Sequence, residues 1–423
     1  MSASIDHRRR QGLCPPADFS VRLRNGVPEF PVHHMRGGTS TGLVIWEALA
    51  PPDLALKEEL LRHLMGVPLD GELPGNRQIT GLGRGPATSN KVFFADVEPG
   101  PDGLRLASTL AQLAAQTAAV DWSVNCGNMS AALPLWALDM GLADPAEPGP
   151  WSIAIRNTNT GVVTTGKVWR RGGGGMEAAA IPGVHGEFPA VDLFLHEPVG
   201  AKTGMLLPTG RPTDDVEGYQ VSCVDVAVPM VIADAAQFGK TAHEPIAELE
   251  ADRDFIAALR KIWIAAGLRM GLKARDGTRL TEAALARSET VPKVCIVGAA
   301  RGRGHLAVRY FTPQTAHASL AVSGGCCIAS AALIPGTVAH AAARGLPAVG
   351  GEFGDCRVGI ENPAGVLDTT IVARQGERGL EIASAAYRRS AQILLRGHVP
   401  LYRASAELRE WLAHAGGEVR PAA

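Results

Sequence analysis

The chain lacks an excess of charge of either sign, a long apolar run and any pair of cysteines with the Cys-x-x-Cys spacing. Its 41 Lys and Arg residues balance 42 Asp and Glu residues, which leaves a net charge of -1. No overall basic field therefore favours nucleic acid or an anionic membrane, and an anionic ligand must be held by local groups. The sequence contains no run of about 18 apolar residues, so it predicts no membrane span. Arg8-Arg9-Arg10 is not followed by the apolar core of a signal peptide.

Patterns typical of disulfide scaffolds and metal sites are missing as well. The seven cysteines are odd in number and include no Cys-x-x-Cys pair, so neither a disulfide framework nor a zinc ribbon is indicated. His33 and His34 are adjacent rather than one helical turn apart, and the other His, Asp and Glu residues show no ligand spacing. We therefore expect no metal site and a reducing, cytoplasmic setting.

What the chain does have is a globular composition. Of its 423 residues, 46% are hydrophobic and 20% charged, which fits two domains that each bury their own core. The 49 glycines and 29 prolines predict many turns and many short strands.

Three pairs of segments indicate an internal repeat. The stretches Cys126–Leu133 and Cys326–Leu333 share Cys, Ser, Ala, Ala and Leu in register. An apolar run begins at Lys91-Val92 in the first half and at Lys293-Val294 in the second. An earlier apolar run follows Met35-Arg36-Gly37-Gly38 in the first half and Val228-Pro229 in the second. Three matches in one order predict a duplicated domain. We place the copies at 28–200 and 201–423, after a flexible arm at 1–27, with a C-terminal strand that can return to the first copy.

Each copy is predicted to contain short strands around one apolar helix. In the first copy the patterns predict strands over 29–34 and 91–97, a helix from Asp53 to Gly66 and a buried helix over 129–142. In the second copy they predict helices over 247–267 and 322–334 and a last helix over 383–395. This is an α+β, barrel-like layout, and not a βαβα parallel sheet.

The segment Asn125-Cys126-Gly127-Asn128 is the strongest candidate for chemistry. Asn125 is an N-cap type of residue, and a thiol in the first turn of a helix feels the positive end of the helix dipole, which favours the thiolate. The backbone N–H groups of Gly127 and Asn128 can receive a carboxylate or enolate oxygen. The alternative is a small buried cysteine behind an ordinary cap.

Two further segments could act on an anionic substrate. Lys91 opens an apolar strand, where it is either a desolvated acid or base or an ordinary solvent-facing lysine. The loop from Arg36 to Ser40 is rich in N–H and hydroxyl donors and resembles an anion cradle, although it lacks the Walker pattern and can equally be a plain glycine turn.

The second half offers weaker candidates. Cys326 mirrors Cys126, so two thiols could face a substrate, but two small core residues at 326 and 327 are the favoured interpretation. His317 lies just before this helix and either binds a carboxylate or is a polar edge residue.

Together these residues resemble a known family. The segments that carry the resemblance run in order from about residue 29 to 400, and they are Met35-Arg36-Gly37-Gly38-Thr39-Ser40, Ser89-Asn90-Lys91-Val92, Asp121-Trp122-Ser123-Val124-Asn125-Cys126-Gly127-Asn128, Asn157-Thr158-Asn159-Thr160-Gly161, Pro208-Thr209-Gly210, Arg269-Met270-Gly271 and Ile334-Pro335-Gly336-Thr337. They are similar to the 2-methylaconitate isomerase family, which includes 4-oxalomesaconate tautomerases, 3-methylitaconate isomerases and aconitate isomerases.

The resemblance implies the diaminopimelate-epimerase-like fold, with two similar domains, each a set of strands wrapped on a central helix, and a site in the cleft between them. It also implies an isomerase without a cofactor that moves an allylic proton in an unsaturated di- or tricarboxylate, such as 2-methylaconitate, aconitate or 4-oxalomesaconate. Lys91 occupies the position of the family's acid/base lysine, and Cys126 that of its active-site cysteine. The implied partner is this small polycarboxylate, with no nucleic acid and no membrane, and a homodimer is left open.

The residues that we assign to substrate binding on this basis are Arg36, Gly37, Gly38, Thr39, Ser40, Ser89, Asn125, Gly127, Asn128, Arg269, Met270, His317, Ser323 and Gly324. Departures from the family pattern fall near the expected cleft, at Thr41, Arg84, Pro86, Asn90 and Cys326, and leave the substrate open. Two rival hypotheses remain: a two-thiol epimerase or racemase that uses Cys126 and Cys326, and a carboxylate-binding protein of this fold without catalysis.

Overall fold

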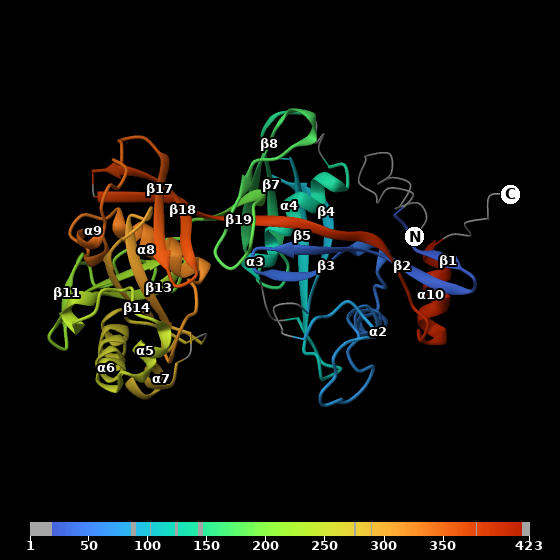
Figure 1. The fold of residues 1–423 in the computed structure, drawn as a ribbon, viewed down its shortest axis with the longest axis horizontal. Coiled ribbons are helices and arrows are strands. Elements are labelled where there is room, and N and C mark those ends of the chain that lie inside the picture. Colours follow the sequence, from blue (N-terminus) through green and yellow to red (C-terminus); the bar gives the residue numbers. More distant parts are fainter. Residues whose placement is uncertain are drawn as a thin grey trace. The chain divides into compact units, whose positions relative to one another are not determined.

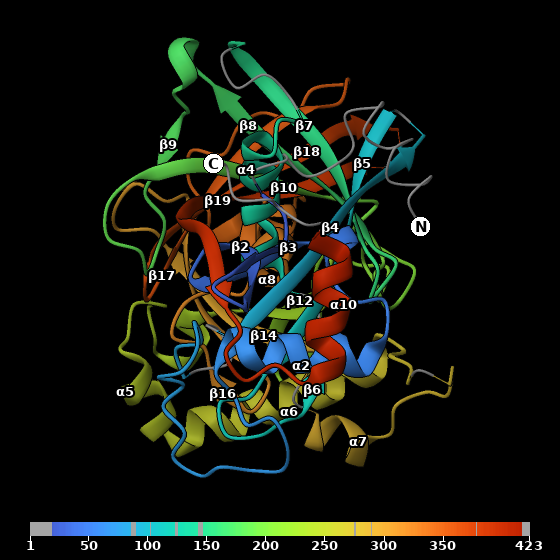
Figure 2. The ribbon, with the colours of Figure 1, turned by 90° about the vertical axis from the view of Figure 1, so that its right-hand side faces the viewer.

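The structure is a computed structural model, and it describes residues 19–85, 90–101, 103–122, 126–142, 147–274, 276–288, 290–377 and 379–416. The chain divides into two compact units (Figures 1 and 2). The first unit comprises Met1–Ala180, Gly186–Leu193 and Arg389–Ala423, and the second comprises Ile181–His185 and Phe194–Arg388. Two strands, β10 (Phe188–His196) and β19 (Gly379–Pro400), have residues in both units.

The first unit is a strand network with helices against both of its faces. Its strands are β1 (Arg22–Arg24), β2 (Val27–Gly37), β3 (Ser40–Trp46), β4 (Lys91–Gly100), β5 (Gly103–Leu113), β6 (Val120–Asp121), β7 (Gly149–Asn157), β8 (Val163–Arg170) and β9 (Ala178–Ala179), and its helices are α2 (Leu54–Met65), α3 (Gly127–Ser130), α4 (Ala132–Asp139) and α10 (Ala406–Gly416). Helices α2 and α10 share one apolar core with β2 to β5. Helices α3 and α4 pack against the other face, on β2, β3 and β8.

The second unit contains strands β11 (Asp214–Val216), β12 (Tyr219–Val226), β13 (Val228–Asp234), β14 (Lys293–Ala299), β15 (Leu306–Thr312), β16 (Thr315–Ala316), β17 (Gly354–Asn362) and β18 (Gly365–Gly376), and helices α5 (Ile246–Ala251), α6 (Arg253–Arg269), α7 (Glu282–Arg287), α8 (Val322–Ala332) and α9 (Val338–Ala342). Residues of α5, α6 and α7 form one core with β12 to β15. Helix α8, which is buried from Gly324 onward, packs against β12, β13 and β18.

The strands pair in the same order in the two units. In the first unit β2 pairs antiparallel with β3, β3 parallel with β4, β4 antiparallel with β5, β5 parallel with β7, and β7 antiparallel with β8. The same alternation runs through β12, β13, β14, β15, β17 and β18 in the second unit. Lys91 and Lys293 therefore open corresponding strands, and the sheet network is mixed rather than purely antiparallel.

The clearest error of the sequence prediction concerns residues 383–395, which form part of strand β19 and not a helix. This strand pairs antiparallel with β18 and then with β2. Its Ala-rich sequence has a high helix propensity, but propensity is a weak prior, and buried pairing on both sides overrides it. The last helix is α10 instead.

Two smaller differences also have local causes. The helix predicted over 247–267 is two helices, because Asp252 leaves the helical conformation and its side chain caps α6 by accepting the N–H of Phe255 at 3.0 Å. Within the segment 1–27 that was predicted as an arm, Val21 is buried and Arg22–Arg24 pairs with β2. Residues 1–18 lie outside the described part of the chain.

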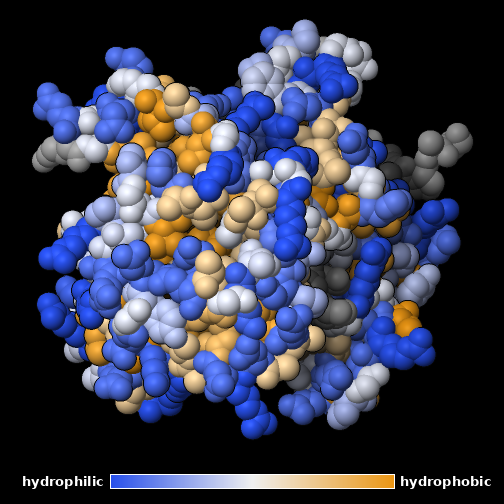
Figure 3. Space-filling view, turned by 60° about the vertical axis from the view of Figure 1, so that its left-hand side comes forward, coloured by the Kyte–Doolittle hydropathy of each residue, from blue (hydrophilic) through white to orange (hydrophobic). Residues whose placement is uncertain are grey.

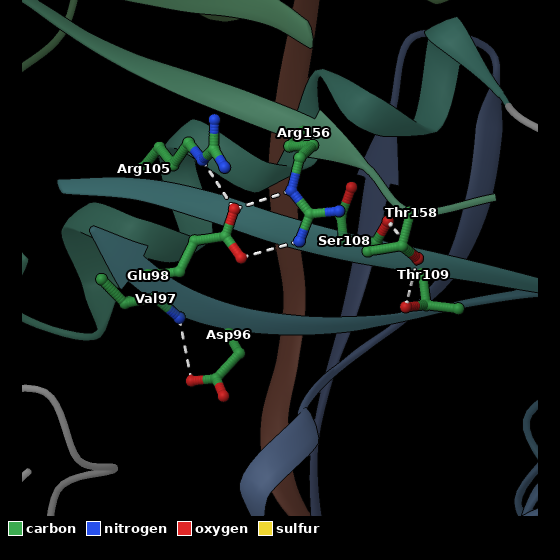
Figure 4. Close-up of polar contacts among 8 residues, drawn as sticks. All are labelled: Asp96, Val97, Glu98, Arg105, Ser108, Thr109, Arg156 and Thr158. Atoms are coloured by element: carbon green, nitrogen blue, oxygen red, sulfur yellow. Dashed lines mark hydrogen bonds and ion pairs between the residues drawn. The ribbon is translucent and has the colours of Figure 1, made fainter. Parts of the chain in front are cut away.

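A shared carboxylate ties three strands of the first unit together (Figure 4). Glu98 of β4 accepts hydrogen bonds from Arg105 of β5 at 2.6 Å and from Arg156 of β7 at 2.7 Å. The hydrogen bonds from Arg156 are the main reason why the pKa of Glu98 is lowered to about 2.

The exposed surface mixes hydrophilic residues with smaller apolar patches, as the face in Figure 3 shows. Within the described ranges, no helix has the length and apolar character that crossing a membrane requires.

Candidate active site

The turn between β2 and β3 lies directly against the first turn of α3. A Cβ atom added at Gly37 would lie 2.6 Å from the carbonyl oxygen of Asn128, and one added at Gly38 would lie 2.6 Å from its side-chain oxygen. Gly38 also has a φ of +55°, which favours glycine. Both glycines are therefore required for the contact between this turn and α3.

Cys126 is itself the N-cap of α3, the role that the sequence analysis gave to Asn125. Its backbone is extended, and its sulfur accepts the N–H of Met129 at 3.4 Å. The predicted single helix over 129–142 is divided at Ala131 into α3 and α4. The thiol therefore lies at the start of the helix, half-buried, where an anionic sulfur can accept a backbone hydrogen bond.

Hydroxyl groups of the β2–β3 turn complete this contact. The Oγ of Ser40 lies 3.9 Å from the Sγ of Cys126, and the side-chain nitrogen of Asn128 donates to the Oγ1 of Thr39 at 3.2 Å. The structure thus brings five of the predicted site residues, Gly37 to Ser40 and Asn128, around Cys126.

Lys91 lies on the same face of the sheet as this cluster. It pairs in parallel with Gly42, two residues after Ser40 on β3, and two residues of strand span roughly 7 Å. Paired residues point to one face of a sheet and successive residues to opposite faces, so Lys91, Gly42 and Ser40 share the face against which α3 packs. A Cβ atom at Gly42 would lie 2.3 Å from the carbonyl oxygen of Lys91.

Lys91 is 5% exposed, and no hydrogen bond or ion pair joins its ammonium to a residue in the described ranges. A reciprocal amide pair fixes the backbone just before it. Asn90 is fully buried, and its side chain exchanges hydrogen bonds with Gln78 at 3.0 and 3.1 Å. Asn90 also accepts the N–H of Arg84 and donates to the carbonyl of Gly85. Asn90 therefore joins the residue just before Lys91 to the segment from Gln78 to Gly85.

Arg36 supports the turn from the opposite face of the β2–β3 pair. It pairs with Thr41, whereas Gly37 pairs with Ser40. Its guanidinium donates to the carbonyl oxygens of Gly38 at 2.8 Å and Ser390 at 3.1 Å and lies 4.6 Å from the centre of the Phe188 ring. Burial lowers the pKa of Arg36. These bonds make Arg36 a positioning residue of the turn, and substrate binding by its guanidinium stays a prediction.

Sequence reasoning missed Arg389. This residue of β19 is buried, and its Nε donates to the side-chain oxygen of Asn128 at 2.9 Å. The arginine therefore fixes which end of the Asn128 amide faces Thr39. No local signal could identify it, because the segment was predicted as a helix and lies 261 positions from its partner.

In the second unit, His317 and Gly324 both lie against Tyr310. The rings of His317 and Tyr310 are 5.8 Å apart, and a Cβ atom at Gly324 would lie 2.6 Å from the Tyr310 ring. Burial, with a smaller contribution from Lys293, lowers the pKa of His317, although the N–H of Ser319 donates to its Nδ1. Ser323 precedes Gly324 in the first turn of α8 and is half-buried.

The other candidates in this unit lie elsewhere. Met270 is 4% exposed within the core beneath α6, where it packs as an ordinary core side chain. Arg269 is exposed and donates to the carbonyl of Asp215. Cys326 and Cys327 are fully buried inside α8. Ser89 and Asn125, also predicted site residues, lie outside the described residues. The described residues hold no group of three or more His, Cys, Asp or Glu side chains arranged for a metal ion.

Comparisons with known proteins give the same assignment over nearly the whole chain. The model of the family described as PrpF protein matches residues 28–402. The 4-oxalomesaconate tautomerase of Pseudomonas putida is 32% identical over 382 residues, which cover 89% of this chain and 98% of that one. The 2-methyl-aconitate isomerase of Cupriavidus necator is 28% identical over 407 residues, with 88% and 98% covered.

A solved structure agrees with these sequence relationships. The crystal structure of methylitaconate-delta-isomerase has a TM-score of 0.73 and 28% identity, and the match covers 89% of this chain and 98% of that chain. The protein belongs to the PrpF family. It is an isomerase of that family, with the mixed α/β fold of methylitaconate-delta-isomerase.

Proposed function

We propose that this isomerase moves an allylic proton in an unsaturated di- or tricarboxylate, without a cofactor, and that Lys91 and Cys126 transfer the proton. The observation that carries the proposal is the shared face of the first unit: Lys91 opens β4 beside Gly42, and the Cys126 thiol lies beside Ser40 at the start of α3. The names of the relatives support the substrate class, because those relatives act on oxalomesaconate, methylaconitate and methylitaconate.

In the proposed reaction, a base removes a proton from the carbon that is γ to a carboxylate or ketone across the double bond. The charge spreads into a dienolate, and a proton returns at the α carbon, or the double bond rotates before the proton returns. The α3 backbone N–H groups and the hydroxyls of Thr39 and Ser40 are suited to stabilise the negative charge that develops on the oxygens.

Lys91 is the leading acid/base group in this scheme. It is largely buried, and it lies on the face of the sheet that carries Ser40 and the start of α3. Cys126 is either the second acid/base group or the neighbour of the developing oxyanion. Ser40, within 3.9 Å, supplies the hydroxyl that orients the thiol.

The two-thiol alternative is disfavoured by one observation. Cys326 has no exposed surface in α8, and its neighbours on both sides are also buried. This burial argues against an epimerase that needs Cys126 and Cys326 together.

A panel of acids tests the proposal. Purified protein is mixed with 2-methylaconitate, cis- and trans-aconitate, 4-oxalomesaconate and 2-methylitaconate, and the products are identified by proton NMR. The proposal predicts isomerisation of at least one acid, which is lost in Lys91→Ala. Turnover of none of them, or equal turnover by Lys91→Ala, contradicts it.

A further inference from the structure

A cavity of about 340 Å³ in the second unit has no part in the proposed isomerisation. The residues that give it its chemistry are Arg303, His305, Arg357, Asp368, Thr370 and Arg388. None of the residues assigned above to the substrate lines it. Its size is at the lower end of the range for small-molecule sites.

The cavity lies on the face of the β17–β18 pair that turns away from α8. Leu367 packs where Gly325 of α8 leaves room for it, because a Cβ atom at Gly325 would lie 2.4 Å from its methyl group. Asp368 follows Leu367 and therefore points to the opposite face, as does Arg357, which pairs with Thr370. Burial agrees: Leu367 is buried, whereas Asp368 and Arg357 have exposed surface.

Most of the charged side chains around the cavity are arginines, which are positively charged hydrogen-bond donors. Among the described residues that line it, Asp368 is the one carboxylate, and Arg303 already pairs with it at 3.2 to 3.4 Å. This pair is exposed and therefore contributes little by itself. The guanidinium of Arg357 forms no hydrogen bond or ion pair with any residue that the structure describes. The Arg357 guanidinium is therefore available to bind an anion in the cavity.

His305 adds a donor without needing to be charged. The backbone N–H of Gly359 donates to its Nδ1 at 2.9 Å. Nδ1 is therefore an acceptor, and in the neutral ring the proton is on Nε2. The cavity consequently offers guanidinium N–H groups, an imidazole N–H and the hydroxyl of Thr370, against one carboxylate that is already paired.

We propose that this cavity is a binding site for a small oxyanion, either a phosphate or a carboxylate, with Arg357 and His305 as its main donors. Planar guanidinium groups bind both kinds of anion through paired hydrogen bonds. The site is independent of the isomerase chemistry and is present whether or not the protein acts on a polycarboxylate.

Isothermal titration of the full chain with inorganic phosphate, and separately with succinate, tests this site. We expect saturable binding of at least one probe, weakened about tenfold or more in Arg357→Gln because a charge-assisted hydrogen bond is lost. Arg374→Gln is the matched control: it makes the same change of charge on β18, but its guanidinium pairs with Glu381 outside the cavity. It should bind like the wild type.

The sign of a second substitution separates electrostatic binding from a structural effect. Asp368→Asn removes the negative charge of this carboxylate, so it should bind the same probe more tightly than the wild type does. Circular dichroism under the titration conditions confirms that the variants are folded. The proposal is overturned if neither probe binds saturably, if Arg374→Gln loses as much affinity as Arg357→Gln, or if Asp368→Asn binds more weakly.

Discussion

The hydroxyl oxygen of Ser40 lies 3.9 Å from the sulfur of Cys126, although 86 positions separate the two residues in the sequence. Ser40 opens β3, and Cys126 caps α3, so this contact joins the turn between two strands to the helix start. If the thiol takes part in proton transfer, the Ser40 hydroxyl orients the Cys126 side chain for that step.

Removing that hydroxyl should lower turnover without unfolding the protein. Ser40→Ala is expected to reduce kcat about tenfold, the scale of a lost hydrogen bond to a group that becomes charged. Cys126→Ser, which keeps a capping side chain, should reduce it further. Steady-state kinetics and thermal melts measure both effects. Cys326→Ser serves as a comparison for stability only, because that thiol is fully buried in α8.

Lys91→Ala should lower kcat about 100-fold or more, the usual contribution of a general acid or base. The matched control is Lys57→Ala in helix α2 of the same unit. The Lys57 ammonium pairs with Glu47 at a distance of 3.2 Å, and neither residue belongs to the proposed site. That control should keep wild-type kcat. Comparable losses in the two variants would mean that the lysine effect is one of charge or stability and not of proton transfer.

A methyl group at Gly42 should push the two site strands apart. The added Cβ would lie 2.3 Å from the carbonyl oxygen of Lys91, too close for any real contact. Gly42→Ala is therefore expected to cost about 1–3 kcal/mol of unfolding free energy, as other overpacked sites do. Gly351→Ala, where no atom lies within 4 Å of the added group, is the control. Denaturant unfolding that found the two variants equally stable would contradict the strand register at Lys91.

His34 should make the protein less stable as the pH falls. Burial, helped by the nearby charge of Arg84, lowers its pKa from 6.5 to about 4. The unfolded chain then binds more protons than the folded one between pH 6.5 and pH 4, so this part of the stability is complete above 6.5 and decreases toward pH 4. The decrease amounts to up to about 3 kcal/mol.

Denaturant unfolding at a series of pH values checks this contribution. His34→Gln, which does not titrate, should show a flatter dependence between pH 6.5 and 4, whereas the exposed His414→Gln should keep the wild-type slope. An unchanged slope in His34→Gln would show that the histidine is not buried in its neutral form.

The parts of the site that the sequence predicts are those with a local pattern. Glycines 37 and 38, the cysteine before Gly127 and the lysine at a strand start are each visible within a few residues, and the structure brings the turn and the helix start together. Helix α2 also has its predicted bounds, because Asp53 caps it and Gly66 ends it in the left-handed conformation.

The parts that the sequence does not predict depend on partners that are distant along the chain. Arg389 reaches Asn128 only because β19 pairs with β2, and an Ala-rich segment gives no sign of that pairing. The role of Asn90 depends on Gln78, whose amide it meets only after the chain has folded back. The face on which Arg36 lies follows from the β2–β3 register, which a glycine-rich turn does not specify.

Solvent deuterium incorporation tests the central claim most directly. The protein is incubated in D₂O with the best acid of the panel, and proton NMR follows the allylic position and the carbon that gains a proton. The account predicts deuterium at the reprotonated carbon at the rate of isomerisation, with both processes lost together in Lys91→Ala. Isomerisation at full rate in Lys91→Ala, or an acid that isomerises while no deuterium enters either the product or the remaining substrate in the wild type, would contradict proton transfer by this site.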